Sequence, residues 1–301
     1  MNQPLVSVVI ATRDRPDLLQ RAVRSILHRT LQEIEIIAVD AGSRPETAAR
    51  CAQALTAIDP RVSLHIAAQA AVPARGISGS RNCGLSLARA PYTVFFDDDD
   101  EMSEPGHLET AVDFLRRHPR ALYFADIRSL DSGRVVSESR MRAVEPLITR
   151  RSISADPPVF ETSAAEFARA ITHRYPHFNA ALLDTALVRE IGGFSGPLFL
   201  AEDVNLFLRY ADRCSTILYR SQAVVDFDVT PRPRPFNVIP PHARDLTVCL
   251  AVSHAPTAIQ IPPLPPAPPH TDAYQPSSPA LQNNAQGNPL ARRALPRQSP
   301  H

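Results

Sequence analysis

A run of five acidic residues follows a short apolar stretch in this 301-residue chain. The run at 97–101 reads DDDDE, and residues 92–96 before it read YTVFF, which is typical of a buried strand. Adjacent carboxylates repel one another unless something neutralises them, and a divalent cation with a preference for oxygen ligands does so. The run therefore predicts a metal site. The alternative is a solvated acidic turn that binds no ligand.

The elements that must position this run form an alternating pattern. Strands are expected at 5–11, 34–39, 62–66, 92–96 and 121–125, and helices at about 16–27, 45–57, 80–90 and 106–118. Asp14 is expected to cap the first helix, and Pro16 suits its first turn. Such alternation predicts right-handed βαβ units and a mostly parallel sheet. Asp40 and Asp97 end two of the strands, so both should lie at the sheet edge where α/β proteins bind ligands.

The second half of the chain has a looser pattern and a distinct tail. A turn at 131–133 suggests a hairpin, helices are expected at 164–172 and 202–212, and late strands at 216–219 and 223–227. Residues 231–301 hold 17 of the 30 prolines, so this tail is expected to be disordered. We therefore expect an α/β domain at 1–230, with halves at 1–128 and 129–230, and a Pro-rich tail at 231–301.

Composition narrows the classes of function. The net charge is +1, which argues against a nucleic-acid binder, and every one of the 32 basic residues is arginine. The four cysteines form no CxxC pair, which favours reduced thiols in a cytoplasmic protein. The first residues are expected to form a strand and not a signal peptide, and no apolar stretch is long enough to span a membrane.

Five segments occur in a characteristic order along the chain. They are VSVVIATRDR at 6–15, EIIAVDAGS at 35–43, SRNCGLSLARA at 80–90, FFDDDDE at 95–101, and GGF at 192–194 followed by AEDVNLFLR at 201–209. In this order they resemble the motifs of the inverting family-2 glycosyltransferases. The resemblance implies the GT-A fold, a mostly parallel sheet sandwiched by helices. It also implies sugar transfer from a nucleoside-diphosphate sugar to an acceptor hydroxyl.

The resemblance implies a set of residues that bind the donor. Asp40 matches the residue that reads the nucleotide base, Arg81 matches an arginine near the diphosphate, and Thr12 in the first motif is expected beside them. The alternatives are a turn aspartate for Asp40 and a surface ion pair for Arg81. Ala41 stands where the family has a second aspartate, which leaves part of the contact to the base or ribose open.

The same resemblance implies a metal site and a catalytic base. Asp97 and Asp99 match the DxD that holds ribose and metal, and either Asp99 or Asp100 is the main ligand of Mn²⁺ or Mg²⁺. Asp203 matches the general base; the alternative is an ordinary carboxylate at a helix N-terminus. Glu202 is expected to orient the acceptor hydroxyl. In the stretch HRYPH, His173 and His177 are expected to be surface residues.

Three other functions are alternatives to this one. A sugar-1-phosphate nucleotidyltransferase would have a glycine-rich loop after the first strand, and residues 11–16 contain no glycine. An aspartyl phosphatase would need Thr or Val where Glu101 stands. A catalytically inactive domain that binds a nucleotide sugar or a metal stays open. The acceptor is undetermined between a saccharide, a lipid-linked molecule and a protein. A position at the inner face of a membrane is compatible with the sequence.

Overall fold

The computed structural model describes residues 3–56, 58–67, 76–142, 145, 151–171, 176–196 and 201–230. The Pro-rich tail and His173 lie outside these described residues. The strands are β1 (Val6–Thr12), β2 (Ile34–Asp40), β3 (Val62–Ile66), β4 (Tyr92–Asp97), β5 (Glu101–Met102), β6 (Leu122–Asp131), β7 (Arg134–Ser137), β8 (Arg151–Ala155), β9 (Pro158–Thr162), β10 (Ala181–Asp184) and β11 (Ile217–Asp228). The helices are α1 (Pro16–Leu27), α2 (Pro45–Thr56), α3 (Gly76–Leu87), α4 (His107–Arg117), α5 (Ala164–Ile171), η3 (Phe178–Ala180), α6 (Thr185–Glu190) and α7 (Glu202–Ala211).

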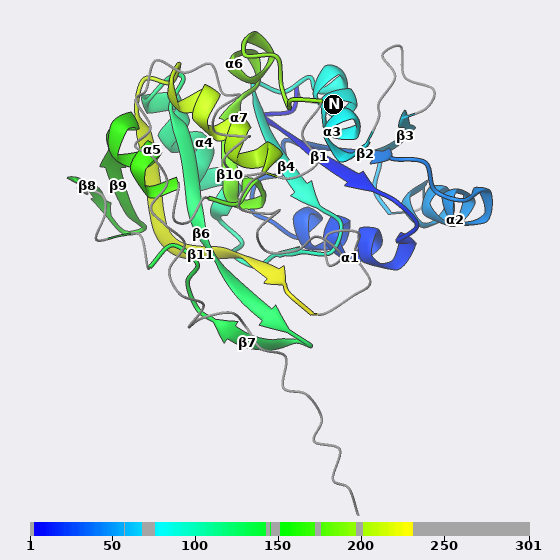
Figure 1. Cartoon of the computed structure of the whole chain (residues 1–301). Helices are drawn as coiled ribbons and strands as arrows, with labels where there is room; N and C mark the ends of the chain where they lie inside the picture. The colour runs from blue at the N-terminus through cyan, green and yellow to red at the C-terminus, as the bar shows by residue number, and fades with distance from the viewer. Residues whose placement is uncertain are drawn as a thin grey trace, which may run out of the picture. The chain divides into compact units, whose positions relative to one another are not determined.

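The sheet joins both halves of the domain (Figure 1). Its strand order is β3-β2-β1-β4-β10-β6-β11-β9-β8, and from β3 to β11 only the two pairings made by β10 are antiparallel. The register sets Thr12 opposite Asp40, and Ala11 opposite Asp97. The predicted convergence of the acidic strand ends at one edge of the sheet is therefore confirmed.

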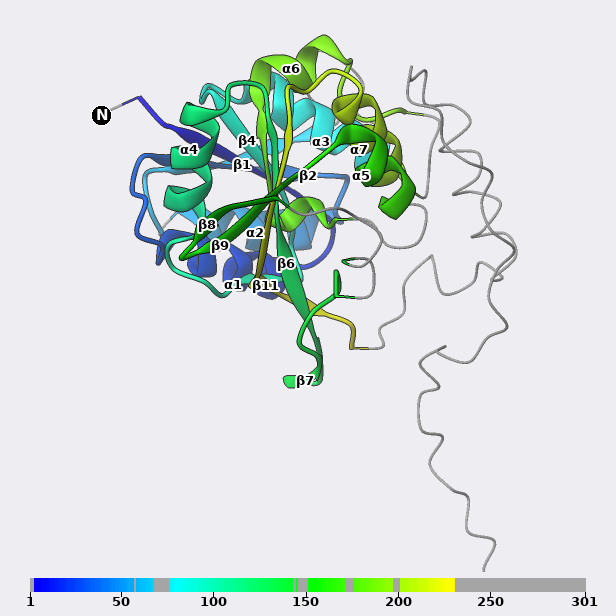
Figure 2. The same cartoon turned by 90° about the vertical axis from the view of Figure 1, so that its left-hand side faces the viewer.

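Helices cover both faces of the sheet, because the central strands are apolar on both sides. Alternate residues such as Val8 and Ile10 of β1 pack in one core with α1, α2 and α4. Residues of the opposite parity, such as Val9 and Phe95, pack in a second core with α3, α5, α6 and α7. Figure 2 shows α1 and α4 on one side of the strands and α3, α5 and α7 on the other.

Most predicted elements are present, with differences that arise from tertiary pairing. The late strands expected at 216–219 and 223–227 are one strand, β11, whose pairing with β6 shifts register between Arg220 and Val225. Such irregularities keep a strand continuous while bending it. They interrupt the alternation of apolar residues, so the sequence pattern predicts two strands where the structure has one. Helix α3 begins at Gly76, before the predicted start at 80. The hairpin at 131–133 is confirmed by the antiparallel β6–β7 pair.

The prediction that Asp14 caps α1 is wrong. Asp14 has a left-handed backbone with φ of 57°, and the N-cap of α1 is Arg15 without a side-chain cap bond. The Asp14 carboxylate instead accepts a hydrogen bond from the backbone N of Arg44 at 3.0 Å, and its own backbone N donates to Ser43 Oγ at 2.8 Å. Asp14 thus joins the loops that follow β1 and β2. Pro16 lies in the first turn of α1, as expected.

No helix among the residues with described structure is both long and apolar enough to cross a membrane. Cys51, Cys83 and Cys214 are free thiols, and Cys249 lies beyond the described part of the chain.

The close approach of α3 to the sheet depends on Gly84. A Cβ at this position would overlap Val9 Cγ1 and lie 3.3 Å from Val39 Cγ2, and both of these side chains are fully buried. We expect Gly84→Ala to lower the free energy of unfolding by about 1–3 kcal/mol, because overpacking forces buried side chains and backbone apart. Denaturant unfolding measures the effect. Gly196→Ala is the matched control, since a Cβ there meets nothing within 4 Å; equal losses would contradict the prediction.

Candidate active site

The acidic run forms a turn between β4 and β5 that two other segments hold in place. Asn179 of η3 accepts a hydrogen bond from the backbone N of Asp97 at 3.1 Å and donates its amide to the Asp100 carboxylate. The other oxygen of Asp100 accepts from the backbone N of Asp228, at the end of β11, at 2.8 Å. Asn179 is fully buried. The carboxylates are therefore fixed by residues about 80 and 130 positions later in the chain.

Three potential metal ligands converge at this turn. Ligand atoms of Asp97, Asp100 and His177 all lie within 4.8 Å of one another, and His177 Nε2 is 3.8 Å from Asp97 Oδ2. Burial lowers the pKa of His177 well below its usual value, with the charges of Arg140 and Arg81 as further causes. The imidazole is therefore neutral, the form that binds metals. Its Nδ1 is buried without a hydrogen-bond partner among the described residues.

The prediction that His177 is a surface residue is wrong, because only 8% of it is exposed. Its ring packs between the rings of Phe178 and Phe227, with centroids at 4.6 and 4.8 Å. No residue spacing in the sequence links position 177 to the run at 97–101. Only the antiparallel insertion of β10 beside β4 brings η3 to the carboxylates.

The two middle aspartates of the run face the β1–α1 loop. Thr12 Oγ1 donates to Asp98 at 2.7 Å, and Arg15 Nη1 donates to Asp98 at 3.0 Å and to Asp99 at 3.2 Å. Burial raises the pKa of Asp98 to about 6, against the lowering effects of Thr12 and Arg15. Asp99, one of the two predicted ligands, is thus ion-paired with Arg15 and lies outside the three-residue group, whereas Asp100, the other, belongs to it. Its role as a metal ligand stays a prediction.

Asp40 lies at the end of β2, beside Thr12, and only 2% of it is exposed. Its Oδ1 accepts hydrogen bonds from the backbone N of Gly42 at 3.0 Å and of Ser43 at 2.7 Å. Asp40 therefore stabilises the turn after β2, which is the alternative role given above for this residue. These bonds occupy one carboxylate oxygen and orient the other, so they are compatible with the predicted contact to a nucleotide base.

Arg81 joins the acidic turn to the second half of the domain. Its Nη2 donates to Asp97 at 2.9 Å and its Nη1 donates to Glu202, at the start of α7, at 2.8 Å. Burial opposes the charge of this guanidinium, but the carboxylates of Asp97 and Glu202 outweigh it and raise the pKa of Arg81. A surface ion pair, the alternative for Arg81, is excluded because only 2% of its side chain is exposed.

Asp203, the predicted base, is buried in the first turn of α7 with 7% exposure. Burial, together with the neighbouring charge of Glu202, raises the pKa of Asp203 to about 7, against the lowering effects of a backbone hydrogen bond and of Arg81 and Arg140. A carboxylate with such a pKa accepts a proton near neutral pH far more readily than an ordinary aspartate. The arrangement therefore combines three potential metal ligands, a buried carboxyl group with a raised pKa, and the ion pairs of Arg81 between them.

The profile of the family described as "Glycosyl transferase family 2" matches residues 7–191, more than half of the chain. The chain belongs to glycosyl transferase family 2. This membership confirms the identification made from the five motifs. The match begins within β1, includes the acidic turn and His177, and ends before Glu202 and Asp203.

Curated relatives are similar to about a third of this chain. The GalNAc(5)-diNAcBac-PP-undecaprenol beta-1,3-glucosyltransferase of Campylobacter jejuni is 32% identical over 109 residues, 36% of this chain and 34% of that protein. The UDP-Glc:alpha-D-GlcNAc-diphosphoundecaprenol beta-1,3-glucosyltransferase WfaP of Escherichia coli is 32% identical over 96 residues, 32% of this chain and 36% of that protein. The chain thus spans about a third of the length of these relatives.

Solved structures share the fold of this chain. TarS of S. aureus (residues 1–349) in complex with UDP-GlcNAc has a TM-score of 0.59 at 18% identity, over 82% of this chain and 65% of that chain. The mannosyltransferase PcManGT of Pyrobaculum calidifontis, in complex with GDP-Man and Mn²⁺, has a TM-score of 0.53 at 15% identity, over 84% and 74% of the two chains. The predicted GT-A-like α/β fold is confirmed.

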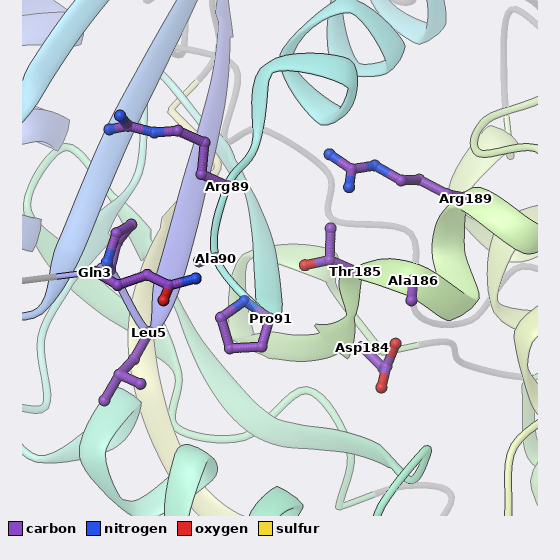
Figure 3. Close-up of a pocket in the computed structure, with 10 residues that line it drawn as sticks. Gln3, Leu5, Arg89, Ala90, Pro91, Asp184, Thr185, Ala186 and Arg189 are labelled. Carbon is purple, nitrogen blue, oxygen red and sulfur yellow. The ribbon is translucent and has the colours of Figure 1, made fainter.

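A hollow of about 430 Å³ lies at the other edge of the sheet from the acidic turn, next to the residues that precede β1 and β4 (Figure 3). Arg89 and Arg189 contribute its cationic groups. Arg89 is paired with Glu35 at 2.8 Å, and Arg189 donates to the carbonyl oxygens of Leu85 and Ala88. Since both guanidinium groups already have protein partners, we assign no ligand to this hollow.

Proposed function

We propose that this family-2 member is an inverting glycosyltransferase that moves a sugar from a nucleoside-diphosphate sugar to an acceptor hydroxyl. The observation that carries the proposal is the buried Asp203 carboxyl, which Arg81 and Glu202 link to the carboxylate cluster at Asp97 and Asp100. Transfer to a hydroxyl needs a base on the acceptor side and stabilisation of the leaving diphosphate on the donor side. The two parts of the site supply these functions.

Residues Asp97, Asp100 and His177 fit a divalent cation, Mn²⁺ or Mg²⁺. Their donor set is two carboxylates and a neutral imidazole, whose Nε2 lies 3.8 Å from Asp97 Oδ2. When bound, the cation would supply Lewis-acid stabilisation of the charge on the leaving diphosphate. Asp99 remains an alternative ligand from the sequence motif. Thr12, Asp40, Asp97 and Asp99 form the proposed donor-binding set, whereas Arg81, also predicted to bind the donor, is buried between Asp97 and Glu202.

Asp203 is the proposed general base and Glu202 its neighbour on the acceptor side. As the new glycosidic bond forms, Asp203 takes the proton of the acceptor hydroxyl, which is a poor nucleophile at neutral pH. One base and one in-line displacement invert the anomeric centre, so no carboxylate nucleophile is needed. Burial of Asp203 supports this assignment, because burial raises the pKa of the carboxyl group to about 7, where the group can both accept and release a proton near neutral pH.

The names of the relatives bear on the acceptor. The Campylobacter jejuni and Escherichia coli proteins are named for undecaprenol-diphosphate-linked acceptors. We extend this to the present chain as a lipid-linked saccharide acceptor, used on the cytoplasmic side of a membrane that the protein contacts peripherally. UDP-GlcNAc in TarS and GDP-Man in PcManGT support a nucleotide-sugar donor.

The test is release of nucleoside diphosphate from a panel of UDP-, GDP- and dTDP-sugars, with Mn²⁺ or with EDTA. We expect metal-dependent release from one donor, and a higher rate when a lipid-linked saccharide acceptor is present. Binding of a donor, measured by calorimetry, without any turnover in the presence of acceptor would favour a catalytically inactive binding domain. Absence of both binding and turnover would contradict the proposed function as a whole.

A further inference from the structure

Arg81 connects the donor and acceptor sides of the site through a single guanidinium group. Asp97 ends β4, whereas Glu202 begins α7, which lies 121 positions from Arg81 in the chain. Each carboxylate binds a different terminal nitrogen, at 2.9 Å and 2.8 Å. The planar fork of arginine fixes two such partners in a defined relative geometry, which a single ammonium group cannot do.

The surroundings of Arg81 leave little access for a substrate. The guanidinium carbon lies 4.1 Å from the centroid of the Phe178 ring and 5.2 Å from that of Phe194. The side chain is 2% exposed, and Nε is buried without a hydrogen-bond partner among the described residues. A diphosphate could reach this group only after both ion pairs and the aromatic packing had rearranged.

The start of α7 depends on this contact because it has no cap of its own. Its N-cap is Ala201, which has a left-handed backbone with φ of 56° and makes no side-chain cap bond. A non-glycine residue is strained in this conformation, so surrounding contacts must hold it. The Glu202–Arg81 ion pair is one such contact, directly beside Asp203.

We propose that Arg81 is a positioning residue that fixes Asp203 relative to the acidic turn and does not bind the donor diphosphate itself. The proposal rests on the function proposed above, and it concerns how the donor side and the acceptor side of the site keep their relative positions. The charged groups that face Asp203 are Glu202, Arg81 and Arg140. Replacing Arg81 therefore changes both the placement of the base and the charge around it.

The test compares Arg81→Lys with Arg220→Lys. Arg220 is a matched control because it is equally buried, with 3% exposure, and is paired with Glu104 at 3.3 Å, outside the proposed site. We expect Arg81→Lys to bind UDP with Mn²⁺ within about 3-fold of wild type in calorimetry. Its single-turnover rate at saturating donor should fall about 100-fold, since small displacements of catalytic groups have effects of this size. Arg220→Lys should keep the rate of the folded protein.

Two outcomes would overturn the proposal. A loss of UDP affinity of about tenfold or more, with an unchanged rate at saturation, would make Arg81 a ligand of the diphosphate. An equal loss of rate in Arg220→Lys would show that replacing any buried arginine lowers the rate, and that Arg81 has no specific positioning role.

Hydrogen exchange supplies a readout that does not need activity. We expect Arg81→Lys to speed exchange in the peptide covering residues 201–206 and to leave that of α1 unchanged. Unchanged exchange in 201–206 would reject the positioning role, even if the wild type transfers no sugar. Conversely, a wild type without turnover but with the expected exchange would reject the proposed function and keep the structural link.

Discussion

Replacing Asp203 with asparagine should lower the rate of sugar transfer by about 10²- to 10⁴-fold, the usual contribution of a general base. Asparagine preserves the shape of the side chain but has no lone pair basic enough to accept the acceptor proton. Asp203 lies in α7 and is not one of the three potential metal ligands, so the affinity for UDP with Mn²⁺ should change little. Single-turnover rates and calorimetry on the same preparation measure the two quantities.

The pH dependence of the wild type provides an independent check of this base. In the proposed mechanism transfer requires ionised Asp203, and burial raises the pKa of Asp203 to about 7. The value of kcat/KM should therefore rise with pH and level off above about 7, not near the ordinary value of an aspartate. Transfer by Asp203→Asn at the wild-type rate, or a profile already flat at pH 5, would contradict the assignment.

The same ionisation affects stability in a defined direction. The pKa of Asp203 is higher in the folded state than in the unfolded state, so between about pH 4 and 7 the folded state binds the Asp203 proton more tightly. The contribution of Asp203 to the free energy of unfolding therefore falls as the pH rises through this range. Above pH 7 the wild type carries an unfavourable buried charge that asparagine lacks. Asp203→Asn should then unfold at no lower temperature than wild type, which separates lost catalysis from lost folding.

Asp100→Asn should weaken Mn²⁺ binding by at least 10- to 100-fold. Loss of a group that merely orients a metal ligand already has effects of this size, and a direct ligand should exceed them. Asp100 converges with Asp97 and His177, whereas Asp99 is ion-paired with Arg15 at 3.2 Å. Calorimetric titration of the metal-free protein with Mn²⁺ measures the affinity without reference to turnover.

Asp99→Asn is the control, because it removes the same charge from the neighbouring position of the same turn. We expect it to reduce Mn²⁺ affinity clearly less than Asp100→Asn does. The reverse order would make Asp99 the main ligand, as one form of the sequence motif predicts, and would remove Asp100 from the metal site. Because Asp100 also accepts a hydrogen bond from the backbone N of Asp228, thermal unfolding of both variants must confirm that they fold.

The sequence by itself determined the first half of the fold. Residues 6–12, 34–40 and 92–97 are apolar on both faces and alternate with helical patterns, and local periodicity of this kind follows from burial alone. Because the strands are parallel, Asp40 and Asp97, which end β2 and β4, lie at the same edge of the sheet. The order of the five motifs added the family and the candidate base Asp203.

Only the tertiary structure decided how the second half completes the site. The position of β10 between β4 and β6 brings His177 and Asn179 to the acidic turn, and a register irregularity keeps β11 continuous up to Asp228. Arg81 acquires its partners in the same way, across 121 residues to Glu202. Contacts at such separations leave no period or spacing in the chain. The carboxylates could therefore be located from sequence, but the residues that orient them appear only once the strands are paired.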